Sequence, residues 1–180
     1  MTARIDITAN RATRSYGRGE QLARVLWWLC TPLFRLSPRP LWGWRAVLLR
    51  LFGAQVGAAV NVYPTVQITM PWNLRLGDQA AVGDRAILYA LGVISIGARA
   101  TVSQYAHLCA GSHDHHDPAR PVLKHPITIG EDAWVCADAF VGPNVRIGAG
   151  AILGARAVAM GDLPAGATGY GNPMQIRGVS

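Results

Sequence analysis

The sequence from residue 129 to residue 159, IGEDAWVCADAFVGPNVRIGAGAILGARAVA, repeats one pattern every six residues. An aliphatic residue opens each repeat, and a small or β-branched residue follows four places later. The opening residues are Ile129, Val135, Val141, Ile147 and Leu153, and Ala159 closes the series. This period fits neither the roughly 3.6 residues of a helical turn nor the two-residue alternation of a strand. It predicts a parallel β-helix in which each hexad forms one face and three hexads complete a coil.

The same spacing extends toward the N-terminus in three sets of three hexads, which begin at Val56, Leu76 and Ile96. Offsets of two residues separate these sets, so each set predicts one coil. Residues 111–126, GSHDHHDPARPVLKHP, contain no repeat before the pattern resumes. We therefore expect a β-helix over residues 54–164 with an extruded loop at 111–126, and function tends to reside in such loops. Residues 165–180 are expected to form a tail that folds back over the last coil.

The N-terminal part of the chain differs from the repeats. Residues 1–19 are polar, and we expect them to form a poorly ordered tail. Residues 20–53 predict two short α-helices. The first covers residues 20–30 and is stopped or kinked by Pro32, and the second covers residues 40–52. The complete prediction is an all-β protein, a parallel β-helix preceded by these two helices.

The net charge of +7 comes entirely from the first fifty residues, which contain nine arginines and only two acidic residues. Residues 51–180 contain eight basic and eight acidic residues. Four of the six tryptophans lie in the two predicted helices. Two interpretations remain open: the helices cover the open end of the β-helix, or they bind an anionic membrane surface as a peripheral anchor. No nucleic-acid motif accompanies the charge, so nucleic acid is not an expected partner.

The cysteines and the start of the chain predict a cytoplasmic protein. Cys30, Cys109 and Cys136 show neither the paired spacing of a disulfide framework nor that of a zinc knuckle. The first twenty residues are polar and contain no apolar run of the kind found in a secretory signal.

Several strings carry a family resemblance from about residue 20 onward. They are SPRPLWGWRAVLLRLFGA (37–54), PWNLRLGD (71–78), ISIGARATVSQYAHLCAGSHDHHDP (94–118), HPITIGEDAWVCADAFVGPNVRIGAGAILGARAV (125–158) and GYGNP (169–173). With them the chain resembles the hexapeptide-repeat acyltransferases, and within that group the colanic acid biosynthesis acetyltransferases. The resemblance implies a left-handed β-helix, a homotrimer with sites between subunits, acetyl-CoA as donor and a sugar hydroxyl as acceptor.

The resemblance places a general base at His113, in the string Gly-Ser-His-Asp that begins at residue 111. A sugar hydroxyl is a weak nucleophile, and an imidazole is well suited to remove its proton near neutral pH. Asp114 is a candidate to orient the His113 ring. We expect direct transfer without an acyl-enzyme, with the oxyanion stabilised by a backbone N–H. No metal site is predicted, and the remaining loop histidines are expected to be loop residues or acceptor contacts: His115, His116 and His125.

The resemblance also implies residues that bind coenzyme A, whose pantetheine arm would lie along a groove beside the later coils. These residues are Trp134, Gly142, Gly154, Ala155 and Arg177. The small residues among them are equally required by the tight corners of the repeats. Three positions depart from the pattern usual in the family, which has an asparagine near Ala90, a lysine at Met160 and an arginine at Gln175. These departures affect the expected donor and acceptor contacts.

The leading functional prediction is an O-acetyltransferase that modifies a sugar of an exopolysaccharide or its lipid-linked precursor. It would work in the cytoplasm or peripherally at the inner face of the membrane. Two alternatives remain. One is acetylation of a small soluble sugar or amino-sugar, and the other is a non-catalytic or carbonic anhydrase-like β-helix protein.

Overall fold

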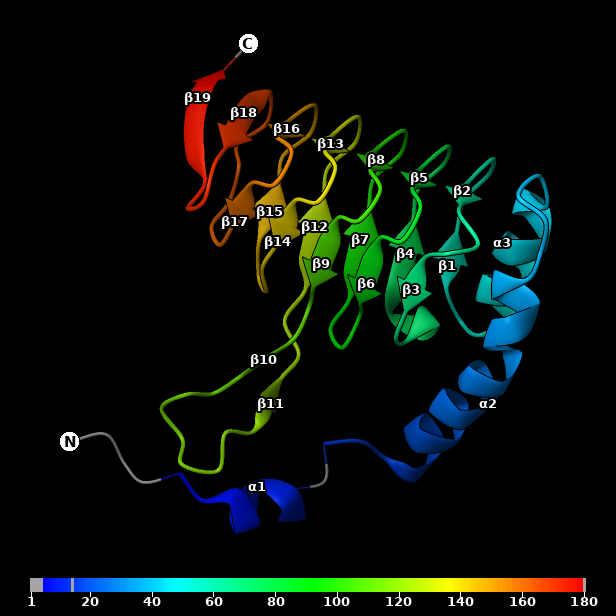
Figure 1. Cartoon of the computed structure of the whole chain (residues 1–180), viewed down its shortest axis with the longest axis vertical. Helices are drawn as coiled ribbons and strands as arrows, with labels where there is room; N and C mark the ends of the chain where they lie inside the picture. The colour runs from blue at the N-terminus through cyan, green and yellow to red at the C-terminus, as the bar shows by residue number, and fades with distance from the viewer. Residues whose placement is uncertain (1–4, 14, 180) are drawn as a thin grey trace.

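The computed structural model of the chain describes residues 5–13 and 15–179, and it forms a stack of β-coils with helices at one end (Figure 1). Three parallel sheets run along the stack. Sheet A contains β1 (Gln55–Val56), β4 (Leu74–Leu76), β7 (Ile94–Ile96), β12 (Ile127–Ile129) and β15 (Arg146–Ile147). The parallel part of sheet B contains β2 (Asn61–Val62), β5 (Ala81–Val82), β8 (Thr101–Val102), β13 (Trp134–Val135), β16 (Ile152–Leu153) and β18 (Ala167–Tyr170). Sheet C contains β3 (Gln67–Ile68), β6 (Ile87–Tyr89), β9 (His107–Cys109), β14 (Phe140–Val141) and β17 (Val158–Ala159).

The strands of successive coils pair in register, which confirms the predicted parallel β-helix. In sheet B, for example, Val62 pairs with Val82, Val82 with Val102, and Val102 with Val135. The aliphatic residue that opens each hexad points inward, and these residues are almost completely buried except for Val56 and Ile68 in the first coil, which are partly buried. In most hexads the small residue four places later is buried as well, so the period of six reflects the inward side chains that each face of the coil contributes.

The corners of the coils explain why small residues recur in the sequence. A Cβ atom added at Gly97 or Gly130 would lie within 2.5 Å of a backbone nitrogen in the next coil. Corner positions also adopt the left-handed backbone conformation, although several carry larger residues, such as Arg99 (φ 58°) and Asp132 (φ 58°). These two side chains form an ion pair between neighbouring coils, with Nε to Oδ1 at 2.7 Å.

Among residues 5–13 and 15–179, three helices rather than the two predicted precede the β-helix: α1 (Ile7–Ala12), α2 (Arg18–Arg35) and α3 (Trp42–Leu51). Helix α1 lies in the segment predicted to be poorly ordered, where the Asp6 carboxylate accepts a hydrogen bond from the Ala9 N–H and caps the helix. Helix α2 continues through Pro32 and is longer than predicted, because the turn after the proline still closes through a hydrogen bond from the Leu36 N–H to the Pro32 carbonyl.

Helices α2 and α3 cover the N-terminal end of the stack, where their inner faces join the core. Trp27 is buried, and its Nε1 donates to the Ile68 carbonyl at 2.8 Å. Arg45 is fully buried and donates to the carbonyls of Val62, Pro38 and Arg39. Burial lowers the pKa of Arg45. Within the described residues, no helix combines the length and the apolar character needed to cross a membrane.

The C-terminal segment continues the fold for one more strand and then reverses. Strand β18 pairs parallel with β16, so sheet B extends beyond residue 164, where the prediction ended the β-helix. Strand β19 (Gln175–Val179) then pairs antiparallel with β18. The two form a hairpin at the end of the stack opposite to the helices (Figure 1).

Candidate active site

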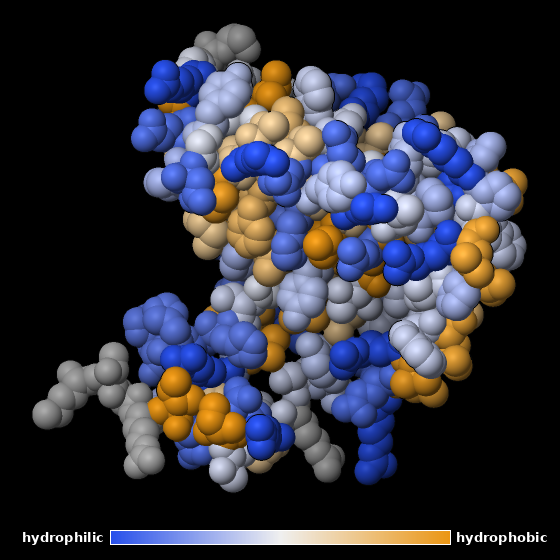
Figure 2. Space-filling view, viewed as in Figure 1, coloured by the Kyte–Doolittle hydropathy of each residue, from blue (hydrophilic) through white to orange (hydrophobic). Residues whose placement is uncertain are grey.

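The extruded loop leaves the stack after β9 and returns at β12, as predicted (Figure 1). Its two arms form a short antiparallel ladder between β10 (Ser112–His113) and β11 (Val122–Leu123). His113 pairs with Val122 in this ladder, and its side chain is exposed. The space-filling view shows the molecule hollowed between this loop and the last coils (Figure 2).

The His113 ring makes one hydrogen bond that determines its chemistry. Its Nδ1 atom lies 2.8 Å from the backbone carbonyl oxygen of Arg120. A carbonyl oxygen only accepts hydrogen bonds, so Nδ1 must carry the proton. The neutral ring is therefore held in the tautomer whose Nε2 has a free lone pair. This is the atom that a general base would use.

Asp114 was a candidate to orient the His113 ring, but its hydrogen bonds go elsewhere in the loop. Its carboxylate accepts a hydrogen bond from the His116 N–H at 2.9 Å, and its own N–H donates to the Pro121 carbonyl at 3.0 Å. Asp114 therefore shapes the turn of the loop, while the bond to the His113 ring comes from the Arg120 backbone. In the described part of the chain, no group of three His, Cys, Asp or Glu side chains is arranged to hold a metal ion.

The structure brings Trp134 and Arg177 into one row of sheet B. In-register pairs connect Trp134 to Ile152, Ile152 to Thr168, and Thr168 to Arg177. Residues paired in this way point to the same face of a sheet. Trp134 is 49% exposed, and its Nε1 donates to the Ser103 hydroxyl at 2.8 Å, which fixes the indole at the surface. Arg177 is exposed at the end of the row.

The other residues predicted to bind coenzyme A lie at two different corners. Gly142 follows β14 and lies one coil beyond Cys109, beside the base of the extruded loop. Gly154 and Ala155 follow β16 at the corner between sheets B and C, where Gly154 lies against the Tyr170 ring. One chain therefore places His113 and Gly142 at a different edge of the β-helix from the row formed by Trp134 and Arg177.

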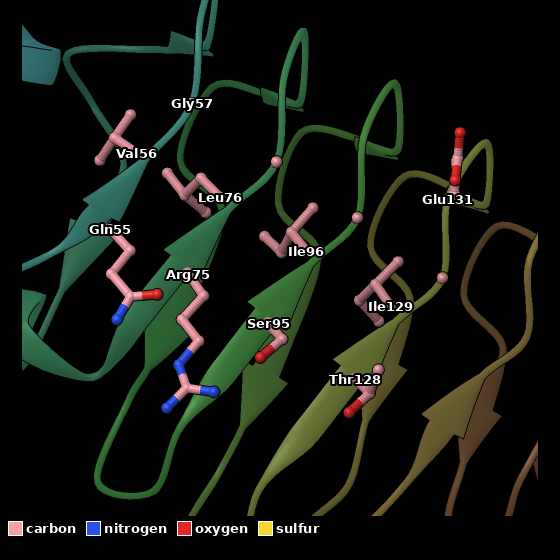
Figure 3. A pocket seen from close by; sticks show the side chains of 13 residues that line it. Gln55, Val56, Gly57, Arg75, Leu76, Ser95, Ile96, Thr128, Ile129 and Glu131 are labelled. Carbon is pink, nitrogen blue, oxygen red and sulfur yellow. The ribbon is translucent and has the colours of Figure 1, made fainter.

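An open groove of about 630 Å³ on the outer face of sheet A was not predicted from the sequence (Figure 3). Its floor is a row of polar side chains, and its rim is formed by the corner glycines. The row consists of Gln55, Arg75, Ser95 and Thr128. The only sequence signal for this groove is that the residue before each aliphatic position in these hexads is polar.

Positive and aromatic side chains gather at the base of the loop, another feature that the sequence did not predict. The Arg24 guanidinium and the Lys124 ammonium each lie 4.5 Å from the centroid of the Tyr16 ring. Lys124 also pairs with Glu20 at 3.4 Å. The pKa of the nearby Tyr89 is raised, chiefly by burial and also by Tyr16, while Arg24 acts in the opposite direction.

Comparison with known proteins identifies the family. The family described as "Bacterial transferase hexapeptide (six repeats)" matches residues 126–159. Over 172 residues the chain is 44% identical to WcaF of Escherichia coli (strain K12), which is named for acetyl transfer in colanic acid biosynthesis; the match covers 95% of this chain and 94% of that protein. The chain belongs to the hexapeptide-repeat acetyltransferases.

Two solved acetyltransferase structures share the fold of this protein. A galactoside acetyltransferase in complex with coenzyme A superposes with a TM-score of 0.85 at 22% identity, covering 98% of this chain and 92% of that one. An acetyltransferase from Vibrio cholerae O1 biovar eltor complexed with acetyl coenzyme A gives a TM-score of 0.83 at 19% identity, covering 93% and 92%.

The position at which many relatives were expected to carry an asparagine is unsuited to ligand contact in this acetyltransferase. The side chain of Ala90 is fully buried, and its carbonyl accepts a hydrogen bond from Asn73 Nδ2 at 2.8 Å. Met160 is exposed and covers Gly142, while Gln175 lies at the start of β19.

Proposed function

We propose that this protein is an acetyl-CoA-dependent O-acetyltransferase that acts on a sugar hydroxyl of an exopolysaccharide or its lipid-linked precursor, with His113 as general base. The observation that carries the proposal is the hydrogen bond from His113 Nδ1 to the Arg120 carbonyl. This bond leaves the basic Nε2 lone pair on a loop that projects from a rigid scaffold.

The reaction would proceed by direct transfer. Nε2 of His113 removes the proton of the sugar hydroxyl while the oxygen attacks the thioester carbonyl, so that a C–O bond forms and the carbonyl oxygen becomes an oxyanion. A backbone N–H would stabilise this charge. The tetrahedral intermediate then collapses, the C–S bond breaks, and the imidazolium returns its proton to the coenzyme A thiolate. A positioned general base contributes about 10²–10⁴-fold, or roughly 3–5 kcal/mol.

The donor would bind along the outer face of sheet B. Trp134 and Arg177 are separated by three strand spacings, about 14 Å, which suits an extended pantetheine arm. Arg177 is suited to bind a phosphate of coenzyme A. Because this row and His113 lie at different edges of one chain, a complete site requires a neighbouring subunit. We therefore propose a homotrimer in which each site combines the loop of one subunit with the row of the next.

Helix α2 supports a peripheral contact with the membrane. Its outer face carries an exposed apolar stripe on the side away from the buried Trp27 and Phe34, formed by Leu22, Leu26, Leu29 and Leu33 and extended by the C-cap residue Leu36. Trp28, which is 72% exposed, lies beside this stripe with Arg24 and Arg35. Leucine facing acyl chains, with tryptophan and arginine at headgroup depth, is typical of an interfacial helix. If the acceptor is held on a lipid diphosphate at the inner membrane face, its phosphates would lie near Arg24 and Lys124 at the base of the loop.

The function is tested by comparing the wild-type protein with His113→Ala, using acetyl-CoA and alkali-deacetylated exopolysaccharide of the producing organism as the acceptor. We expect the variant to lose about 10²–10⁴-fold in kcat while the KM for acetyl-CoA stays unchanged. Mass spectrometry of the polysaccharide made with and without the protein should show one acetyl group per modified sugar. Retained transfer by His113→Ala would exclude the proposed base, and acetylation of soluble sugars alone would favour the alternative acceptor.

The membrane contact is tested by flotation with vesicles that contain one-quarter anionic lipid. The double variant Leu29→Ser/Leu33→Ser should bind at least tenfold more weakly than wild type, because each leucine loses part of about 1.5–3 kcal/mol of apolar transfer. Met160→Ser removes an equally exposed apolar side chain outside α2 and should bind normally. Equal binding by all three proteins would exclude α2 as the contact.

A further inference from the structure

Helix α1 lies against the tip of the extruded loop, although the two segments are more than 100 residues apart in the sequence (Figure 1). The Asp6 N–H donates to the Pro118 carbonyl at 2.9 Å. Four residues later, Asn10 Nδ2 donates to the Ala119 carbonyl at 2.6 Å and to the Arg120 carbonyl at 3.2 Å. These contacts connect the N-terminal segment to three successive carbonyls of the loop.

The Arg120 carbonyl is the point at which this contact reaches the candidate site. It accepts one hydrogen bond from Asn10 Nδ2 and one from His113 Nδ1. A carbonyl oxygen has two lone pairs, so both bonds can form together. Arg120 adopts the left-handed conformation (φ 46°), which an arginine rarely takes without surrounding contacts to hold it. Its carbonyl direction therefore depends on those contacts.

Few other hydrogen bonds within the loop hold it in this conformation. Its ladder contains only the pairs Ser112 with Leu123 and His113 with Val122, and an isolated two-stranded ladder of this length is marginal in water. Asp117 stabilises the turn locally, where its carboxylate accepts from the Ala119 N–H and its carbonyl from the Arg120 N–H. Asp114 adds the bonds to Pro121 and His116 described above, and the N-terminal segment supplies further contacts, at the tip through Asp6 and Asn10 and at the base through Tyr16.

We propose that Asn10 is a positioning residue for acetyl transfer, which acts by holding the Arg120 carbonyl that sets the ring orientation and tautomer of His113. The inference rests on the proposed role of His113. A free imidazole in water favours the tautomer with its proton on Nε2, which is the wrong one for a base at this atom. The Arg120 carbonyl reverses that preference, and Asn10 keeps the carbonyl in place. The N-terminal segment is thus part of the catalytic apparatus as well as a cover for the β-helix.

The test uses the full-length protein and three variants. Asn10→Asp keeps the side-chain shape but removes the donor, Asn10→Ala removes both, and Thr8→Ala changes an exposed neighbour in the same helix. Long-range ¹H–¹⁵N spectra of the histidine rings, with His113 assigned through His113→Ala, report the tautomer directly. We expect Nδ1–H in wild type and Thr8→Ala, and a shift toward Nε2–H in both Asn10 variants. With deacetylated exopolysaccharide as acceptor, kcat should fall about tenfold while the KM for acetyl-CoA changes less than twofold.

The outcomes separate this inference from the proposed function. Unchanged His113 ring signals and an unchanged kcat in both Asn10 variants would overturn the inference. If His113→Ala retained acetyl transfer, the proposed base would be wrong, while the ring spectra would still decide whether Asn10 sets the tautomer. A lowered kcat accompanied by an equal rise in the KM for acetyl-CoA would show general damage rather than positioning, and would also overturn the inference.

Discussion

The corner glycines predict a sharp contrast between two apparently similar substitutions, Gly130→Ala and Gly142→Ala. A Cβ atom at residue 130 would lie 2.4 Å from the backbone nitrogen of Ala149 and 2.7 Å from its Cα atom, in the next coil. An ordinary contact requires at least 3.4 Å. The two coils must therefore separate locally by about 1 Å, because neither partner is a flexible side chain.

The cost follows from the hydrogen bonds that join these coils. The Gly130 N–H donates to the Ile147 carbonyl at 2.7 Å, and the Gly150 N–H donates to the Glu131 carbonyl at 2.8 Å. A separation of about 1 Å carries both beyond hydrogen-bond range, at about 1 kcal/mol each, and adds about 1–3 kcal/mol of repacking strain. We expect Gly130→Ala to lose about 3–5 kcal/mol of folding free energy.

Gly142→Ala is the matched control. There the added Cβ would meet the Met160 sulfur at 2.6 Å, but this side chain is 64% exposed and can move away, and the Ala159 carbonyl oxygen at 3.2 Å needs to shift by only a few tenths of an ångström. We expect a change within about 1 kcal/mol, helped by the lower entropy of the unfolded chain. Thermal unfolding at one protein concentration would measure the difference, since about 4 kcal/mol lowers Tm by roughly 10–15 °C in a chain of this size. Equal melting temperatures for the two variants would refute the reasoning.

Three further predictions follow from single side chains. Arg45→Met should lower the free energy of unfolding in urea by about 3–5 kcal/mol, because it leaves the buried Val62 carbonyl and the part-buried Pro38 and Arg39 carbonyls without this donor; a loss below about 1 kcal/mol would contradict this. Burial lowers the pKa of His107 below its ordinary value of 6.5. The unfolded chain then binds a proton at His107 that the folded chain does not, so the free energy of unfolding falls as the pH drops below about 6.5. The Tm of His107→Gln should therefore decline less steeply with acidification than the Tm of the wild-type protein. Ala59→Gly should raise the free energy of unfolding by about 0.5–1 kcal/mol, and Tm slightly with it, because glycine relieves the strain of the left-handed backbone at this corner (φ 52°). A lower Tm would show that the corner is not strained.

The β-helix was predictable because its repeat is local. Each inward position, such as Val135 or Ile147, is marked by its own hexad, so the pattern can be read without knowing which coils touch. Helix α1 was missed because its stability comes largely from contacts with the loop. The hydrogen bond from Asn10 to Arg120 joins residues 110 positions apart, and no periodicity marks such a pair.

The candidate site was predictable only in part. The family resemblance indicated His113 and Trp134, and the structure adds the backbone carbonyl that fixes the imidazole tautomer. The residue expected to orient the ring was Asp114, the nearest carboxylate in sequence. The structure instead uses a carbonyl brought close by a reversal of the loop, and any residue type at position 120 would supply the same group. Backbone groups of this kind leave no signature in a sequence.

The two ends of the coil stack determine how copies of this protein can associate. Stacked parallel strands present unpaired edges that could template further chains end to end. Here α3 blocks one end, and β19 blocks the other by running against the direction that a further coil would need. Growth of sheet B along the axis is thereby disfavoured, which would leave the flanks of the coil stack for the trimeric association proposed above.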